Sequence, residues 1–297
     1  MNVLALKSNA LLMVTAAIWG FAFVAQRVGM AYVEPFTFNG IRFALGSLSL
    51  VPLLLLSRGE AALSPMGKPP AGPKTVFWGG AVTGIALFMG ASLQQIGLVY
   101  TTAGKAGFIT GLYVVIVPMM GLFWRQKTDA GTWVGALLAA IGLYFLSVTE
   151  TFTISVGDFL ELAGAFFWAG HVLIIGWLSP RINPIRLSFW LFAVCSVLSL
   201  LTAFCIESVS LAGIFQAAIP ILYGGVCSVG VAYTLQVVAQ RDAKPAHAAI
   251  ILSAEAVFAA FGGWLVLGET LSVRGLWGCG FMLSGILLSQ LWGLSRR

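Results

Sequence analysis

Charged residues are scarce in this chain, and their scarcity excludes most soluble architectures. Only 9% of the 297 residues are Asp, Glu, Lys or Arg, whereas 59% are hydrophobic and the mean hydropathy is +0.97. An ordinary soluble domain has about 25% charged residues. Apolar runs of about 20 residues can cross a bilayer as helices, whereas the strands of a membrane barrel are short and alternate apolar with polar residues. The composition therefore predicts an all-α integral membrane protein.

The sequence also lacks the usual signatures of metal, redox and nucleotide chemistry. The four cysteines have none of the paired spacings of a zinc site, so we interpret them as small buried hydrophobes. No phosphate-binding loop occurs, so ATP is not expected to drive the protein. An embedded enzyme would need converging titratable groups, and the sequence offers two distant histidines and one isolated carboxylate. We therefore predict no metal, no cofactor and no enzymatic activity.

Ten apolar segments are predicted to cross the membrane. They are Asn9–Met30, Pro35–Leu56, Val76–Ile96, Ala103–Trp124, Gly131–Val148, Phe159–Leu178, Leu187–Cys205, Phe215–Val238, Ala246–Leu267 and Gly275–Leu291. With the N-terminus in the cytoplasm, most basic residues lie on the inner side and only Arg27, Lys105 and Arg274 on the outer side. The scattered positive charge thus indicates topology rather than nucleic-acid binding. It predicts a multi-pass protein of the cell (inner) membrane with cytoplasmic N- and C-termini.

The chain contains a weak internal repeat. Trp19 and Trp168, Pro35 and Pro184, and Ser47 and Ser196 are each separated by 149 positions, while Gly135 and Gly142 are each separated by 143 positions from a glycine, at 278 and 285. These pairs divide the chain into residues 1–150 and 151–297, with five predicted spans in each part. Because five is odd, the two five-helix repeats must be inverted relative to each other. Inverted repeats are a recurring architecture of transporters, with the substrate site near the midplane.

Several motifs carry a resemblance to a known family. They are Ile18-Trp19-Gly20, the segment from Pro35 to Arg42, Tyr100-Thr101-Thr102-Ala103, and the run from Leu252 to Glu269 with Glu255 near its start. In order and spacing, the chain resembles a ten-span member of the drug/metabolite transporter (DMT) superfamily, in the EamA-type group of amino-acid and metabolite exporters. The first half departs from the pattern, because Arg125-Gln126-Lys127 replaces the Gly-Glu pair that would close the fourth span. The resemblance implies that spans five and ten are peripheral and that spans one, three, four, six, eight and nine line a cavity.

Glu255 is the leading candidate for a functional residue. It lies near the middle of the ninth predicted span, where an ionisable group is costly and usually faces a cavity or a partner. We interpret it as a site for a proton or for a substrate ammonium group. The alternative is a protonated carboxyl group that hydrogen-bonds between helices and holds the bundle together.

Other polar and aromatic residues within spans are weaker candidates for the same cavity. His171 could relay protons together with Glu255, or it could be a satisfied core histidine. Trp19 and Trp168 could form facing walls that stack on a substrate, or they could only fill space between helices. Arg42 could bind a substrate carboxylate, but we expect its side chain to snorkel to the outer surface. The remaining candidates for the cavity wall are Tyr113, Tyr233 and Gln236.

Two spans contain residues that allow bending. Pro118 lies in span four, and Pro220, Gly224 and Gly225 lie in span eight. Proline removes an internal hydrogen bond and permits a kink, so we predict hinges at these positions. By contrast, the glycines of spans five and ten are expected to be close-packing surfaces.

These observations predict a secondary transporter that exports small organic metabolites by alternating access. Apolar or aromatic amino acids suit a cavity with few fixed charges and several rings, and phosphorylated substrates would need more cations than the spans contain. The expected partners are the substrate and the surrounding lipid, and a homodimer is possible. The alternatives are a broad drug/metabolite exporter or importer coupled to protons, a membrane-embedded enzyme, and a structural or sensory subunit without substrate flux.

Overall fold

The computed structural model describes residues 3–56, 71–101, 103–126, 128–147, 155–268, 270 and 272–295. Within this part of the chain, every regular element is helical. The elements are α1 (Val3–Gly29), α2 (Pro35–Ser49), α3 (Val51–Leu56), α4 (Pro73–Tyr100), α5 (Ala103–Gly111), α6 (Tyr113–Phe123), α7 (Ala130–Ser147), α8 (Val156–Leu178), α9 (Pro184–Ile206), α10 (Leu211–Gln216), α11 (Ala218–Leu222), the π-helix η2 (Tyr223–Tyr233), α12 (Thr234–Ala239), α13 (Pro245–Leu252), α14 (Glu255–Leu267) and α15 (Val273–Ser295).

All ten predicted segments are helical, and the all-α membrane fold is confirmed. Eight helical segments of the described chain are long and apolar enough to cross a membrane, and Ala130–Phe145 and Val273–Ser289 are shorter apolar helices. The count of ten spans therefore stays a prediction. Four helices begin with a proline, at Pro35, Pro73, Pro184 and Pro245. Proline fits the first turn of a helix because its missing N–H has no intrahelical partner there.

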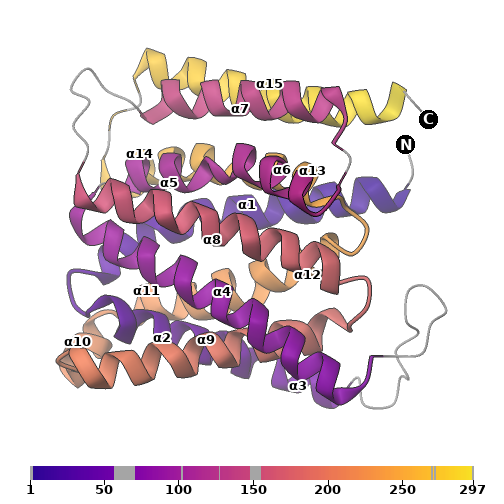
Figure 1. Ribbon diagram of the computed structural model, residues 1–297. Coiled ribbons are helices and arrows are strands. Elements are labelled where there is room, and N and C mark those ends of the chain that lie inside the picture. The colour runs from indigo at the N-terminus through magenta and orange to yellow at the C-terminus, as the bar shows by residue number, and fades with distance from the viewer. Residues whose placement is uncertain are drawn as a thin grey trace.

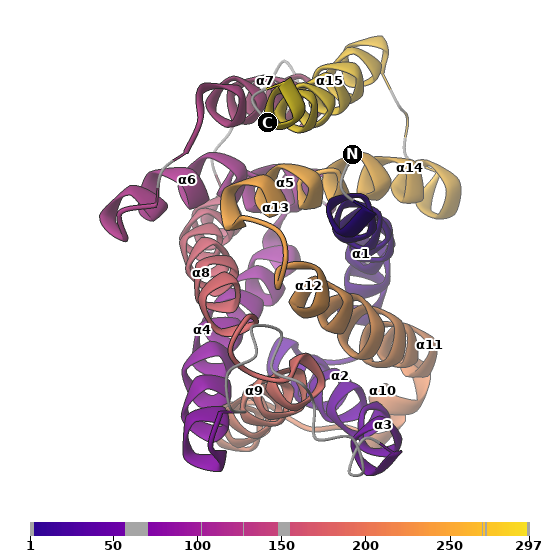
Figure 2. The same cartoon turned by 90° about the vertical axis from the view of Figure 1, so that its right-hand side faces the viewer.

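The helices run roughly parallel or antiparallel to one another and surround a central region. Figure 1 views them from the side, and Figure 2 views them nearly end-on, with α4 and α8 on one side and α1, η2 and α12 on the other. Helices α7 and α15 form a separate outer layer, as the family resemblance implies for spans five and ten. Helix α1 begins and α15 ends at the same end of the bundle, which we call the terminal end; the other is the far end.

The outer layer is held together by reciprocal glycine contacts. A Cβ atom built on Gly135 would lie 2.7 Å from the carbonyl oxygen of Gly285, and one on Gly142 would lie 2.5 Å from that of Gly278. Only glycines allow the two backbones to approach so closely. The expectation of close packing fails at Gly280, which has open space beside it. By the offset of 143, Gly135 is the counterpart of Gly278, and Gly142 is the counterpart of Gly285. Each glycine of α7 therefore contacts the counterpart of the other, as a two-fold axis between α7 and α15 requires.

The contact between α2 and α9 has the same reciprocity. The hydroxyl of Ser196 donates to the carbonyl oxygen of Gly40 at 2.8 Å, and that of Ser47 donates to the carbonyl oxygen of Phe189 at 3.3 Å. Ser47 and Gly40 lie 149 positions before Ser196 and Phe189. The two hydrogen bonds are therefore equivalent under exchange of the halves. This supports the predicted inverted repeat, although its boundary at residues 150 and 151 lies outside the described residues.

Two predicted spans are interrupted in the same way. Span four divides at Leu112 between α5 and α6, and span nine divides before Glu255, between α13 and α14. At each break an N–H bonds to the carbonyl three residues earlier, from Leu112 to Ile109 and from Ala254 to Ile251. The two breaks are 142 positions apart, so Tyr113 at the start of α6 is the counterpart of Glu255 at the start of α14.

Candidate functional site

A cavity lies where the helices of both halves meet, and it gathers all seven residues proposed for its wall. The empty space between its lining residues is about 490 Å³, a volume that includes open solvent at its mouth. No residue of the outer layer lines it. The lining residues are Trp19, Ala22, Phe23, Gln26, Arg42, Gln94, Thr110, Tyr113, Trp168, His171, Val172, Ser228, Tyr233, Gln236, Leu252 and Glu255.

Aromatic rings form one wall of the cavity. Tyr233, the last residue of the π-helix η2, lies between the two tryptophans. Its ring centroid is 4.4 Å from that of Trp19 and 6.1 Å from that of Trp168. The Trp168 and Tyr233 rings are stacked, and His171 meets both of them edge-on. The tryptophans therefore do not face each other directly, because Tyr233 joins them into a continuous surface. Such a surface can stack on an apolar or aromatic ligand.

Two glycines determine how close these rings come to their neighbours. A Cβ atom on Gly20 would lie 2.7 Å from the carbonyl oxygen of Glu255, so α1 and α14 touch backbone to backbone beside Trp19. A Cβ atom on Gly90 of α4 would lie 3.2 Å from the indole ring of Trp168. The glycine after Trp19 in the Ile18-Trp19-Gly20 motif thus brings Trp19 and Glu255 into the same site.

Several polar side chains of the cavity are buried without a partner. Glu255 is 4% exposed and its Oε1 atom accepts no hydrogen bond from a described residue. The same holds for the hydroxyl of Tyr113, both ring nitrogens of His171 and both amide atoms of Gln236. Buried polar groups are normally paired, so a group of unpaired ones around a hollow indicates a place for water or a polar ligand.

The structure corrects the expectation for Arg42. Its side chain is 3% exposed and lines the cavity instead of snorkelling to the surface. The guanidinium carbon lies 4.9 Å from the ring centroid of Phe43 and 5.5 Å from that of Phe38. Arg42 forms no ion pair with a described residue. The two rings and Gly224 lie beside the side chain, and a Cβ atom on Gly224 would lie 3.4 Å from the Cδ atom of Arg42.

Sequence reasoning missed further buried polar residues on the far-end side of the cavity. Gln94 and Gln95 are buried, and Gln94 lines the cavity. Glu161 is fully buried and accepts a hydrogen bond from the hydroxyl of Thr110 at 2.9 Å. Their nearness to the predicted span ends concealed them, because hydropathy does not show which face of a helix turns inward.

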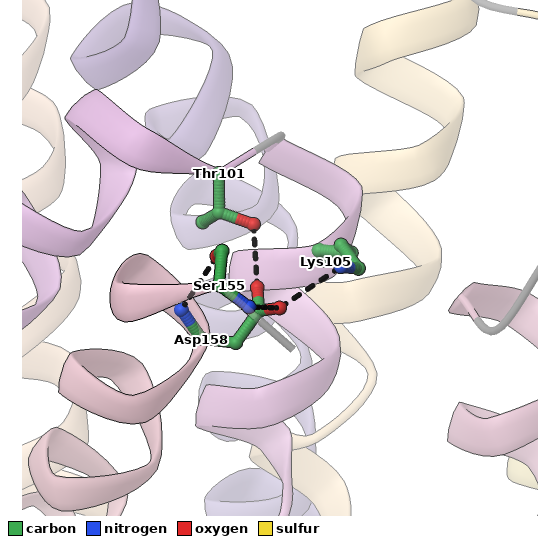
Figure 3. A network of polar contacts seen from close by, with 4 residues as sticks. All are labelled: Thr101, Lys105, Ser155 and Asp158. Carbon is green, nitrogen blue, oxygen red and sulfur yellow. Dashed lines mark hydrogen bonds and ion pairs between the residues drawn. The ribbon is translucent and has the colours of Figure 1, made fainter. Parts of the chain in front are cut away.

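Asp158 joins three elements at the far end of the bundle (Figure 3). Its carboxylate accepts hydrogen bonds from Thr101 and Lys105 at 2.8 and 2.9 Å, and it forms a capping box with Ser155 at the start of α8. Thr101 and Lys105 lie on either side of the turn from α4 to α5. The network ties this turn to the start of α8.

The predicted hinge residues occupy irregular helical regions. Pro118 lies inside α6, six residues beyond the break at Leu112. Pro220 lies in α11, and Gly224 and Gly225 begin η2. Long π-helical stretches are rare and are found mostly at functional sites. Whether these residues act as hinges stays a prediction. Among the cysteines only Cys195 is buried, so the expectation of four buried cysteines is wrong.

Comparison with known proteins identifies relatives over most of the chain. The model of the EamA-like transporter family matches residues 6–148 and 155–291, once in each half. An uncharacterized transporter of Archaeoglobus fulgidus is 33% identical over 94% of this chain and 84% of its own length. The uncharacterized transporter YoaV of Bacillus subtilis is 22% identical over 92% of each chain. One solved crystal structure superposes with a TM-score of 0.78 at 17% identity, covering 96% of both chains, which shows a shared fold.

Proposed function

The chain belongs to the EamA-like transporter family, and on this premise we propose that it is a secondary transporter exporting small organic metabolites by alternating access. The preferred substrates are apolar and aromatic amino acids. The chain is a multi-pass membrane transporter, and its relatives are named transporters, which argues against an enzyme. The cell (inner) membrane and cytoplasmic termini complete the proposal.

One observation carries this proposal: a single cavity receives residues from both halves and combines aromatic rings with unpaired polar groups. Trp19 and Arg42 come from the first half, and Trp168, Tyr233 and Glu255 from the second. A site between two halves of similar structure can be exposed to either side by a rocking movement of one half against the other. The breaks at Leu112 and before Glu255 support such movement, because they lie beside the cavity on both halves.

Glu255 is the proposed coupling residue, with His171 as a second proton carrier. The carboxylate would bind either a substrate ammonium group or a proton, so that binding of one releases the other. Proton exchange would then supply the energy for export, and the substrate's own gradient is the alternative source. The same site would also serve an importer if the gradients were reversed.

Counterflow into liposomes tests the proposal. Purified protein is reconstituted with an unlabelled amino acid inside, and uptake of a labelled panel of amino acids, amines and drugs is followed at two pH values. We expect saturable counterflow of apolar and aromatic amino acids above that of protein-free vesicles. Counterflow of drugs alone would favour the broad-exporter alternative. Absence of counterflow for every compound would refute the transporter proposal and favour a structural subunit.

A Glu255→Gln variant tests the coupling role. Gln keeps the shape of the side chain but can neither bind a proton nor attract an ammonium group. We expect counterflow to fall and to lose its dependence on pH. Unaltered flux with an unaltered pH response would remove Glu255 from the mechanism. Glu207, whose carboxylate caps the start of α2 at the far end, provides the matched control substitution.

A further inference from the structure

Three helix ends at the terminal end of the bundle each carry a cation paired with a tryptophan. Helices α4 and α9 begin at this end and α8 finishes there (Figure 1). In each pair the two residues are four positions apart, the cation lies nearer the terminal end, and both side chains are exposed. The pairs, which together we call the terminal-end patch, are Lys74 with Trp78, Arg181 with Trp177, and Arg186 with Trp190.

Helix packing brings the three pairs onto one surface. A Cβ atom on Gly79 of α4 would lie 3.0 Å from the Cδ1 atom of Ile182, and one on Gly80 would overlap the Cβ atom of Trp190. The start of α4 therefore lies between the end of α8 and the start of α9. Successive residues of a helix are turned by about 100°, so Lys74 and Trp78 face away from both neighbours. The pairs of α8 and α9 flank this outward face on its two sides.

The described chain does not neutralise the positive charge of the patch. None of its three cations forms an ion pair with a described residue. Arg181 lies against its own tryptophan, with the guanidinium carbon 4.9 Å from the ring centroid of Trp177, a contact that supplies no anion. At the far end, by contrast, Lys105 is paired with Asp158 at 2.9 Å. The patch thus calls for anions from outside the chain.

We propose that the terminal-end patch binds the headgroups of anionic phospholipids, with the phosphates at the three cations and the tryptophan rings at the boundary between headgroups and acyl chains. The segments Pro73–Tyr100, Val156–Leu178 and Pro184–Ile206 are each long and apolar enough to cross a membrane, so the patch lies where headgroups are found. Tryptophans are enriched at this depth, and basic clusters beside spans attract anionic lipids. A zwitterionic phospholipid carries its own ammonium group and has no net charge, so the patch favours the anionic kind.

Lipid bound at the patch contacts both halves of the protein. Helix α4 belongs to the first match of the family model, and α8 and α9 belong to the second. A ligand that binds only the packed arrangement of these helices stabilises it by mass action. Added anionic lipid should therefore raise the melting temperature. The inference does not depend on what the cavity transports, because no residue of the patch lines the cavity.

Thermal unfolding in detergent with added lipid tests the proposal. The probes are phosphatidylglycerol, phosphatidylcholine with the same acyl chains, and inorganic phosphate as a free anion. Wild type is compared with single and triple variants in which Lys74, Arg181 and Arg186 are replaced by Gln. A second triple variant, Lys74→Arg with Arg181→Lys and Arg186→Lys, keeps all three charges. Arg274→Gln removes a cation at the start of α15, at the far end, and is the control for the single variants.

We expect phosphatidylglycerol to raise the melting temperature of the wild type at concentrations at least about tenfold lower than phosphatidylcholine. The triple Gln variant should lose this preference, and each single variant of the patch should lose part of it. The charge-conserving triple variant and Arg274→Gln should keep it. High salt should weaken the effect of phosphatidylglycerol on the wild type, because screening reduces the attraction between exposed charges. If the triple Gln variant does not fold, the single variants and Arg274→Gln provide the same comparison.

Three results would overturn the inference. Equal shifts with phosphatidylglycerol and phosphatidylcholine would show that headgroup charge is not selected. An equal loss in Arg274→Gln and in the single variants of the patch would show that only the net charge of the protein attracts the lipid. A shift with inorganic phosphate as large as that with phosphatidylglycerol would show an anion site that needs no lipid. Each of these results leaves the proposed transport function standing, because that function is tested by counterflow.

Discussion

The contact between α1 and α14 at Gly20 offers a sharp test of how the cavity is built. A Cβ atom at this position would lie 2.3 Å from the Cβ atom of Phe258 and 2.7 Å from both the amide nitrogen of Ala259 and the carbonyl oxygen of Glu255. Ordinary van der Waals contact begins at 3.4 Å, so the backbone contacts are short by 0.7 Å. Two of the three atoms belong to the backbone and cannot rotate away. Gly20→Ala must therefore push the two helices apart.

The expected magnitude follows from two opposing effects. Overpacking of a tight contact lowers the free energy of unfolding by about 1–3 kcal/mol, whereas alanine favours a helix over glycine by about 1 kcal/mol. We expect a net loss of stability for Gly20→Ala, together with impaired transport because Trp19 and Glu255 move relative to each other. Gly170→Ala in α8 is the matched control, since a Cβ atom there meets nothing within 4 Å.

Thermal unfolding of the purified variants in detergent measures the difference. Gly20→Ala should melt below the wild type, and Gly170→Ala should melt at or above it. Liposome uptake of the same samples shows whether the loss extends to function. If Gly20→Ala melts as high as Gly170→Ala, the close approach of α1 and α14 does not exist as described, and the argument that this glycine unites Trp19 with Glu255 fails.

Substitutions at three further positions test other parts of the structure by the same melting assay. Burial alone would raise the pKa of Asp129, but hydrogen bonds from Thr132 and the charge of Lys244 hold this pKa below its usual value. Asp129→Ala should therefore lower the free energy of unfolding by about 1 kcal/mol at neutral pH. The difference in stability between variant and wild type should disappear as the pH falls through the lowered pKa. Arg125 has a left-handed φ of 54°, so Arg125→Gly should stabilise the protein by about 1 kcal/mol, whereas Arg125→Val should not. Asp158→Asn should lower the melting temperature at low salt more than at high salt, because it removes the ion pair with Lys105.

The sequence predicted the helical fold and seven residues of the cavity wall from simple physical rules. Trp19, Trp168 and Glu255 lie near the middle of their spans, whereas tryptophans are usually found at the membrane interfaces and charged side chains outside the membrane. A tryptophan or an ionisable residue at that depth generally faces other protein or a cavity. Their convergence in one hollow follows from the helix packing and could not be read from hydropathy. Spacing along one helix relates residues on a single face, but it does not say which helices meet.

Arg42 shows where such reasoning failed. The prediction that Arg42 snorkels assumed that its side chain faces lipid, where an arginine side chain extends toward the nearest water. In the structure its helix packs against η2, and Gly224 and Gly225 leave room for the arginine stem. The burial of Gln94 and Glu161 was missed for the same reason. Depth in the membrane can be counted along the sequence, whereas the inward face of each helix depends on its neighbours.

The two halves have similar helical scaffolds but place different side chains at equivalent positions of the cavity. At the offset of 149, Arg42 corresponds to Leu191, whereas the two helix breaks, 142 positions apart, pair Glu255 with Tyr113. Each pair thus contains one acidic or basic residue and one residue that is neither. A cavity with two arginines or two glutamates would suit a ligand with two identical ends. This cavity instead has one arginine and one glutamate, contributed by different halves. Because the two halves present different side chains, the two ends of a ligand bound between them would meet different surroundings.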